Sequence, residues 1–166
     1  MTMEDKNEKY MRIALEEAMI AAKEDEVPIG CVIVRNNEVI ARTHNQKVKS
    51  NDATKHAEIL SINMATKHIG SWYLDECDMY VTLEPCMMCT GAIINSRVRK
   101  VYFATDDPKG GCFISNIKIN DIPSLNHYPE YECGLLQDEA AQLLKDFFKN
   151  KRKMAKLARK QLNNEE

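Results

Sequence analysis

The segment MYVTLEPCMMCTGAIINS, residues 79–96, decides the fold of this chain. Its first five residues, Met79–Leu83, are mostly apolar or β-branched and predict a short strand. Glu84-Pro85 ends that strand, and a proline is tolerated at the start of a helix, where its missing amide would have had no partner. The remainder, from Cys86 to about Ser96, predicts a helix. The segment is therefore predicted to be a strand that leads directly into a helix.

Further helices and strands are predicted on both sides of this segment. Before it, the predicted elements are a helix at Tyr10–Lys23, a hairpin of strands at Ile29–Arg35 and Val39–Thr43, and a helix at His56–Ile69 capped by Asp52 or Thr54. After it, they are strands at Val98–Ala104 and Tyr131–Leu136, a long helix at Gln137–Gln161, and between the strands a loop, residues 105–129, with one helical turn near Ile114–Ile119. This order predicts an α/β fold, a three-layer α/β/α sandwich around a mixed, mostly parallel five-stranded sheet.

Length and composition restrict the class of protein further. With 166 residues, of which 44% are hydrophobic and 29% charged, the chain is predicted to form a single domain, residues 1–166, with one core. Residues 1–9 lack the apolar run of a signal peptide, and the longest uncharged run, Pro85–Ser96, is about half of what spans a bilayer. We therefore expect a cytoplasmic protein without a membrane partner. In that reducing compartment, clustered cysteines more often bind metal or perform chemistry than form disulfides.

Positive charge is concentrated near the end of the chain. The segment 145–160 holds eight cations against Asp146 alone, so it carries +7 and leaves −9 for the rest of a chain whose net charge is −2. A basic C-terminal helix of this kind predicts an anionic partner such as nucleic acid, unless it is only a solvated helix face. The candidate RNA-binding residues are Lys149, Lys151, Arg152, Lys153 and Lys156, followed by Arg159 and Lys160. Met154 and Leu157 continue the apolar stripe of this helix and are expected on its core side.

Two short motifs carry the candidate chemistry, His56-Ala57-Glu58 and Cys86-Met87-Met88-Cys89, and each stands where the chain enters a helix. Either motif alone is weak evidence, because both arise often in structural roles. Together they supply two thiolates and one imidazole, a set of three zinc ligands that leaves the fourth position open for water, as in catalytic sites. Glu58 need not be a ligand, and a carboxylate beside such a water is suited to proton transfer.

The remaining cysteines are expected to be structural. Cys31 lies within a strand-like apolar run, and Cys77 and Cys133 lie near predicted strand starts. Each of these three is expected to be a small buried hydrophobe. The sequence pattern gives no assignment for Cys112.

Four segments, Glu26–Val34, Thr82–Arg97, Asp107–Gly111 and Phe147-Phe148, carry a resemblance that covers nearly the whole chain. They resemble the bacterial tRNA adenosine deaminases, a family of cytidine deaminase-like zinc enzymes. The resemblance implies one Zn²⁺ per chain and a homodimer. The residues it assigns are His56, Cys86 and Cys89 as zinc ligands, Glu58 as proton shuttle, Asn45 at the purine and Asp107 near the target ribose.

The activity that this resemblance implies is hydrolytic deamination of adenosine to inosine in tRNA, at the wobble position of the anticodon of an arginine tRNA. Two alternatives remain open. One is a guanine, cytidine or dCMP deaminase that acts on a free base, nucleoside or nucleotide, against which the basic segment and Asp107–Gly111 argue. The other is a noncatalytic zinc-stabilised nucleic-acid-binding module, against which Glu58 argues, because a structural zinc site has no use for that carboxylate.

Overall fold

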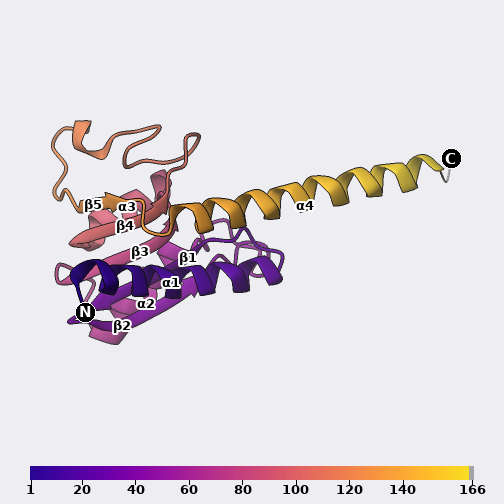
Figure 1. Ribbon diagram of the computed structural model, residues 1–166. Helices are drawn as coiled ribbons and strands as arrows, with labels where there is room; N and C mark the ends of the chain where they lie inside the picture. Colours follow the sequence, from indigo (N-terminus) through magenta and orange to yellow (C-terminus); the bar gives the residue numbers. More distant parts are fainter. Residues whose placement is uncertain (165–166) are drawn as a thin grey trace.

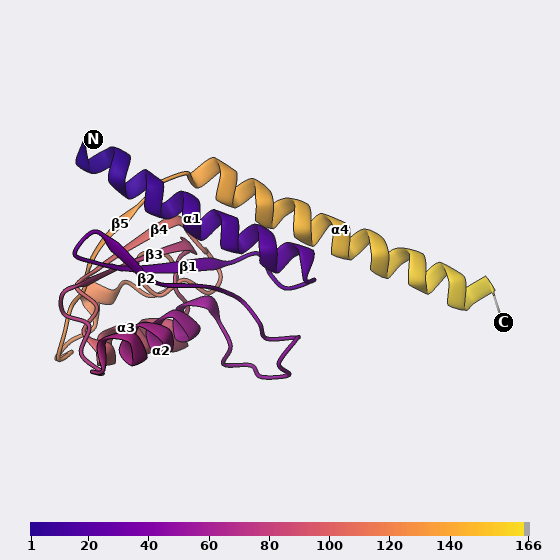
Figure 2. The ribbon, with the colours of Figure 1, turned by 90° about the horizontal axis from the view of Figure 1, so that it is seen from below.

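The computed structural model describes residues 1–164, which are arranged in three layers (Figure 1, Figure 2). The middle layer is a sheet of β1 (Gly30–Arg35), β2 (Glu38–His44), β3 (Cys77–Leu83), β4 (Lys100–Thr105) and β5 (Glu130–Cys133), in the order β2-β1-β3-β4-β5. β1 pairs antiparallel with β2 and β3, whereas β4 pairs parallel with β3 and β5. Only β1 therefore runs against the other four strands. The predicted mixed, mostly parallel sheet is confirmed.

Two helices cover each face of the sheet. α1 (Met3–Lys23) and α4 (Gln137–Asn164) lie on one side, and α2 (Ala57–Ile69) and α3 (Met87–Ser96) lie on the other, as the edge-on view of Figure 2 shows. This arrangement confirms the predicted α/β/α sandwich. It also brings the first residues of α2 and α3, which carry the two sequence motifs, to the same face of the sheet.

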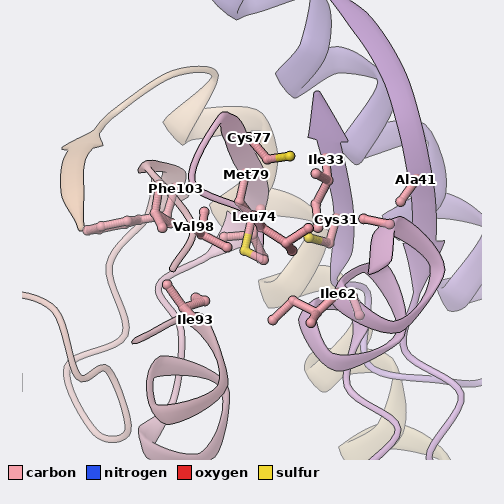
Figure 3. Packing of buried hydrophobic residues seen from close by; sticks show 14 of the residues in the cluster. Cys31, Ile33, Ala41, Ile62, Leu74, Cys77, Met79, Ile93, Val98 and Phe103 are labelled. Atoms are coloured by element: carbon pink, nitrogen blue, oxygen red, sulfur yellow. The ribbon is translucent and has the colours of Figure 1, made fainter. Parts of the chain in front are cut away.

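Alternate residues of the central strands form two cores, because successive side chains of a strand point to opposite faces. In the core under α2 and α3, Ile62 and Ile93 of these helices lie against Cys31 and Met79 of the strands (Figure 3). The core under α1 consists of Tyr10, Met11, Ala14, Leu15, Val32, Val34, Tyr80, Tyr102, Ala104 and Ala140. Burial on both faces explains why β1, β3 and β4 are apolar along most of their length.

Most element boundaries lie within three residues of the sequence prediction, and three elements differ in more informative ways. α1 begins at Met3 rather than Tyr10, because Thr2 and Asp5 form a capping box in which each side chain accepts the other's backbone N–H. β5 is Glu130–Cys133 rather than 131–136, and it ends where Gly134 adopts a φ of +115°. The helical turn predicted near 114–119 is a 3₁₀ turn at Ile119–Asp121.

The second half of α4 projects beyond the other elements, as both ribbon views show (Figure 1, Figure 2). Every residue from Phe148 to Asn164 is exposed. Met154 and Leu157 are 58% and 47% exposed, so the prediction that they lie on the core side is wrong. The apolar stripe of the helix simply continues past the end of the sheet. Neither α4 nor any other described helix has the length and hydropathy of a membrane-spanning segment.

Candidate active site

The two sequence motifs meet at the N-terminal ends of α2 and α3. His56 and Cys86 are the N-cap residues of these helices, and neither side chain caps its own helix. Instead, His56 Nδ1 lies 3.6 Å from Cys86 Sγ and 3.5 Å from Cys89 Sγ. The three ligand atoms all lie within 4.8 Å of one another. The fold thus gathers one imidazole nitrogen and two sulfur atoms around one point.

The separations between these atoms fit a tetrahedral zinc ion. Zn–N bonds of about 2.0 Å and Zn–S bonds of about 2.3 Å at tetrahedral angles place nitrogen and sulfur about 3.5 Å apart. The observed separations are 3.5 and 3.6 Å. Two soft sulfur donors and an imidazole are also ligands that zinc prefers. His56, Cys86 and Cys89 therefore fit the predicted metal set in both geometry and chemistry.

The ionisation of the two thiols supports the same interpretation. A hydrogen bond from Cys89 lowers the pKa of Cys86 to about 4, and His56 adds to this effect against the cost of burial. The pKa of Cys89 is raised far above its ordinary value, first by its hydrogen bond to Cys86 and then by burial. The hydrogen bond to Cys86 raises the pKa of His56. Two thiols so close together resist double ionisation, and a divalent cation between them would stabilise both thiolates.

Glu58 lies in the first turn of α2, buried beside this cluster and 3% exposed. Its Oε2 is buried and has no hydrogen-bond partner within residues 1–164. Burial raises the pKa of Glu58 to about 7, and the nearby Cys86 thiolate acts in the same direction. An unpartnered buried oxygen costs about 1–3 kcal/mol, so its persistence is expected where a substrate or water supplies the partner. A carboxyl group with a pKa near neutrality can both accept and donate a proton.

Asn45 directly follows β2, and its Oδ1 accepts a hydrogen bond of 2.8 Å from the backbone amide of Ala57. Asn45 therefore supplies the hydrogen-bond acceptor for the first backbone amide of α2. The prediction that Asp52 or Thr54 does so is wrong, since the Asp52 carboxylate accepts the amide of Thr54 within their own loop. Asn45 is 5% exposed and lines the same hollow as His56. With Oδ1 held by the helix, its side-chain NH₂ is the group that remains to contact a ligand.

One hollow adjoins these residues, a second shares the lining residues Val27 and Phe148 with it, and α4 forms a wall of both. The first has a volume of about 470 Å³ and is lined by Asn45, His56, Phe147 and Lys151, among others. The second has a volume of about 810 Å³ and is lined by Asp107, Lys109, Gly110 and Arg152, among others. Phe148, which is 43% exposed, contributes to both linings. Volumes of this size are typical of sites for small organic ligands.

Asp107 lies at the second hollow rather than beside His56. Its Oδ1 accepts the backbone amides of Lys109 and Gly110 at 3.2 and 3.3 Å, and its carbonyl oxygen accepts the amide of Gly111 at 2.9 Å. The carboxylate therefore shapes its own turn. The predicted role near the ribose is compatible with this position only if the target nucleotide extends from the first hollow toward the second.

The structure separates the five candidate RNA-binding residues of α4 into two groups. Lys151 and Arg152 line the hollows, although Lys151 Nζ also pairs with Asp25 Oδ2 at 2.6 Å. Lys149, Lys153 and Lys156 are exposed and belong to neither lining. Only the first group is therefore placed beside the candidate site.

The other cysteines follow the sequence prediction in part. Cys31 and Cys77 are buried as expected, but Cys133 is exposed, because the short edge strand β5 leaves most of its residues uncovered. Cys112, which the sequence left unassigned, is buried, and its thiol donates to the carbonyl oxygen of Gly110. It does not belong to the metal-type cluster found among the described residues.

Sequence reasoning missed two buried carboxylates near the site, those of Glu26 and Glu84, each 2% exposed. Glu26 Oε1 accepts the backbone amide of Lys49 at 2.7 Å and so holds the loop after Asn45. Glu84 lies between β3 and the cysteine motif, and its oxygens accept hydrogen bonds from the loop that follows Asp107. The sequence did carry a signal, because each of these glutamates stands beside an apolar stretch. Glu26 begins the segment Glu26–Val34, and Glu84 lies within the segment Thr82–Arg97.

The fold and the site define a class of enzyme, the deaminases. A family model for MafB19-like deaminases matches residues 5–152, and the chain belongs to this family. It is 45% identical over 157 residues to a tRNA-specific adenosine deaminase of Bacillus subtilis (strain 168). This alignment covers 95% of this chain and 98% of the relative. It is also 45% identical over 143 residues to a tRNA-specific adenosine deaminase of Agrobacterium fabrum, covering 86% and 94%. Within the deaminases, the chain thus belongs to the tRNA-specific adenosine deaminases.

Solved structures show the same relationship. A structure from a study of tRNA:A34 deaminases at the wobble position of transfer RNA superposes with a TM-score of 0.80 at 44% identity, covering 82% of this chain and 99% of the other. A guanine deaminase from Bacillus subtilis superposes with a TM-score of 0.61 at 32% identity, covering 81% and 89%. The fold is therefore shared by deaminases of different substrates, and the family resemblance seen in the sequence is confirmed.

Proposed function

We propose that this protein is a zinc-dependent enzyme that catalyses the hydrolytic deamination of adenosine to inosine in tRNA. The observation that carries the proposal is the unpartnered, buried Oε2 of Glu58 beside the cluster of His56, Cys86 and Cys89. A purely structural zinc site needs no such carboxylate, which argues against a noncatalytic module. The names of the relatives supply the substrate class, an adenosine within tRNA.

The residues of the site have distinct tasks in this reaction. His56, Cys86 and Cys89 would hold a zinc ion, which would supply Lewis-acid activation of a water molecule. Glu58 accepts a proton from the water molecule that attacks the purine and returns protons to the purine ring and to the departing amine, so that adenosine and water give inosine and ammonia.

The surrounding hollows position the nucleotide. In this proposal the side-chain NH₂ of Asn45 contacts the purine in the first hollow, where it lies with His56. Asp107 contacts the ribose side of the nucleotide from the second hollow. Arg152 and Lys151 of α4 line these hollows and contact the RNA backbone, whose phosphates favour guanidinium and ammonium groups.

The finer assignment is the wobble position of the anticodon of an arginine tRNA. The wobble position is supported by the similarity to a structure studied as a tRNA:A34 deaminase, and the arginine tRNA rests on the family resemblance alone. An anticodon loop also suits the chemistry, because an unpaired base reaches a deep site at a cost of only a few kcal/mol. A homodimer, which the family resemblance implies, and a cytoplasmic location, which residues 1–9 predict because they lack the apolar run of a signal peptide, belong to the same proposal.

The test is an inosine assay with an anticodon hairpin of an arginine tRNA beside free adenosine, guanine, cytidine and dCMP. We expect turnover of the hairpin and little turnover of the free compounds. A second hairpin, with the adenosine moved by one position, tests the wobble assignment and should be a poor substrate. Turnover of guanine or cytidine without turnover of either hairpin would replace this proposal with the free-base or nucleoside alternative.

A further inference from the structure

The carboxylate of Glu84 has an unusual concentration of hydrogen bonds. Glu84 is buried between β3 and the segment Pro85-Cys86, which begins the cysteine motif. Oε2 accepts the backbone amides of three consecutive residues, and Oε1 accepts a hydroxyl and a further amide. The donors are Phe113 N at 3.2 Å, Ile114 N at 3.3 Å, Ser115 N at 3.2 Å, Ser115 Oγ at 2.6 Å and Asp107 N at 3.4 Å.

All five donors belong to one loop, residues 107–115, which carries Asp107 and Lys109 into the lining of the second hollow. The loop is attached to the cysteine motif at a second point, because the amide of Cys112 donates to the carbonyl oxygen of Pro85 at 2.9 Å. Residues 84 and 85 therefore hold the loop, and residue 86 is a zinc ligand of the proposed site. The wall of the second hollow and the metal site share one short anchor.

Gly111 shows how closely the loop follows the carboxylate. A Cβ atom at this position would lie 2.0 Å from Glu84 Oε2 and 2.7 Å from the carbonyl oxygen of Asp107. Any side chain would push the carboxylate and the Asp107 turn apart. The close approach therefore requires glycine at this position, independently of backbone conformation.

We propose that Glu84 is a positioning residue, which holds the loop 107–115 at a fixed place relative to Cys86 and thereby sets the affinity for the RNA substrate. This inference rests on the proposed function, because it assigns the loop to substrate binding. A buried charge is a poor way to stabilise a fold, since an apolar side chain of similar size often serves as well. An acceptor for several donors at once does specify one loop conformation, and Asp107 and Lys109 keep their places in the lining of the second hollow only while the loop holds that conformation.

Three variants perturb the contact to different degrees, and one variant serves as a matched control. Glu84→Gln keeps the shape but replaces one oxygen with an NH₂ group that faces the loop donors. Gly111→Ala displaces the carboxylate from the side of the loop, and Ser115→Ala removes one hydroxyl donor only. The control is Gly91→Ala on α3, where an added Cβ meets no atom within 4 Å.

The measurements are kcat and KM for the hairpin, zinc content, Tm and hydrogen exchange at the amides of residues 113–115. For Glu84→Gln and Gly111→Ala we expect KM to rise about tenfold or more, with kcat within about threefold of the wild type and one zinc retained. Exchange at 113–115 should become at least about tenfold faster, because the amides lose their acceptor. Ser115→Ala should show a smaller change in the same direction, and Gly91→Ala should match the wild type in kcat, KM, zinc content and exchange at residues 113–115, with Tm unchanged or raised because alanine favours a helix interior.

Two results would overturn the proposal. If Glu84→Gln and Gly111→Ala lower Tm, zinc content and kcat together while KM is unchanged, Glu84 has a structural role only. If exchange at residues 113–115 does not change in either variant, the carboxylate does not hold the loop. If the wild type fails to deaminate the hairpin, the proposed function fails, and the exchange rates then decide by themselves whether Glu84 positions the loop.

Discussion

The zinc-type cluster and the outer half of α4 contrast in almost every physical respect. His56, Cys86, Cys89 and Glu58 are half-buried or buried at two helix starts, and their positions are set by the sheet and both helices. From Phe148 to Asn164, every residue of α4 is exposed, although Phe148, Lys151 and Arg152 also line the two hollows. The cluster offers a few groups with strongly shifted pKa values, whereas the helix offers many cations around its circumference.

This contrast separates two kinds of contribution to function. Reaction chemistry needs groups whose ionisation is altered by burial and by close neighbours, so it depends on single residues. Attraction of RNA needs accumulated positive charge near a surface, so it is spread over several residues and is sensitive to salt. Substitutions in the cluster should therefore change kcat in large steps, and substitutions in α4 should change KM in small ones.

The largest effect is expected from Cys86→Ala. Loss of one of three ligands should remove zinc, abolish measurable deamination and lower Tm, because the site ties the starts of α2 and α3 together. Elemental analysis and calorimetry measure these changes. Cys133→Ala is the matched control, since Cys133 is exposed and outside the cluster. A Cys86→Ala protein that keeps both zinc and activity would remove this residue from the metal site.

The next largest effect is expected from Glu58→Gln. The amide cannot transfer protons, so kcat should fall by about 10²–10⁴-fold or more. Zinc content and the Kd for the hairpin should stay close to wild type, because Glu58 is not among the ligand atoms. Single-turnover kinetics isolate the chemical step. Deamination within about threefold of the wild-type rate would show that another group transfers the protons.

The same contrast explains which features the sequence could predict. The cluster of His56, Cys86 and Cys89 beside Glu58 was predictable because zinc chemistry restricts residue type and spacing, and because the motifs coincide with helix starts. The helix α4 was predictable from its periodicity, but the point where it leaves the sheet was not. An amphipathic pattern says nothing about the length of the surface beneath it, and so Met154 and Leu157 were wrongly assigned to the core side.

Interactions between distant segments account for the other differences. The capping of α2 by Asn45 and the loop held by Glu84 join residues 12 and about 30 positions apart, beyond any local pattern. The nearby Asp52 and Thr54 were the wrong choice, because local capping rules consider only residues next to the helix start. They cannot predict a cap by Asn45, which lies 12 residues before the first residue of the helix. Cys133 was misassigned because its strand is a short edge strand, for which burial depends on neighbours rather than on its own residues.

A smaller effect is expected when the exposed part of α4 is removed. Truncation after Phe148 should raise KM for the hairpin and flatten its salt dependence, while zinc content and kcat at saturating RNA remain. The free energy of unfolding should change little, because the removed residues that the structure describes are all exposed. Initial rates at several salt concentrations measure this. Undiminished deamination of tRNA with an unchanged salt response would show that the segment is only a solvated helix face.

The smallest effect is expected at Lys151, and it distinguishes this cation from its neighbours. Lys151 Nζ already pairs with Asp25 Oδ2, so binding of a phosphate by Lys151 must compete with that carboxylate. Lys151→Ala should therefore change the slope of log affinity against log salt by less than the 0.7–0.9 or so expected for one full phosphate contact. Asp25→Asn should free the ammonium group and steepen the slope.

Lys153→Ala is the comparison, because Lys153 is exposed and has no ion pair within residues 1–164. Equal slope changes for Lys151→Ala and Lys153→Ala, with none for Asp25→Asn, would mean that RNA displaces Asp25 at no cost and that α4 acts as an undifferentiated basic surface.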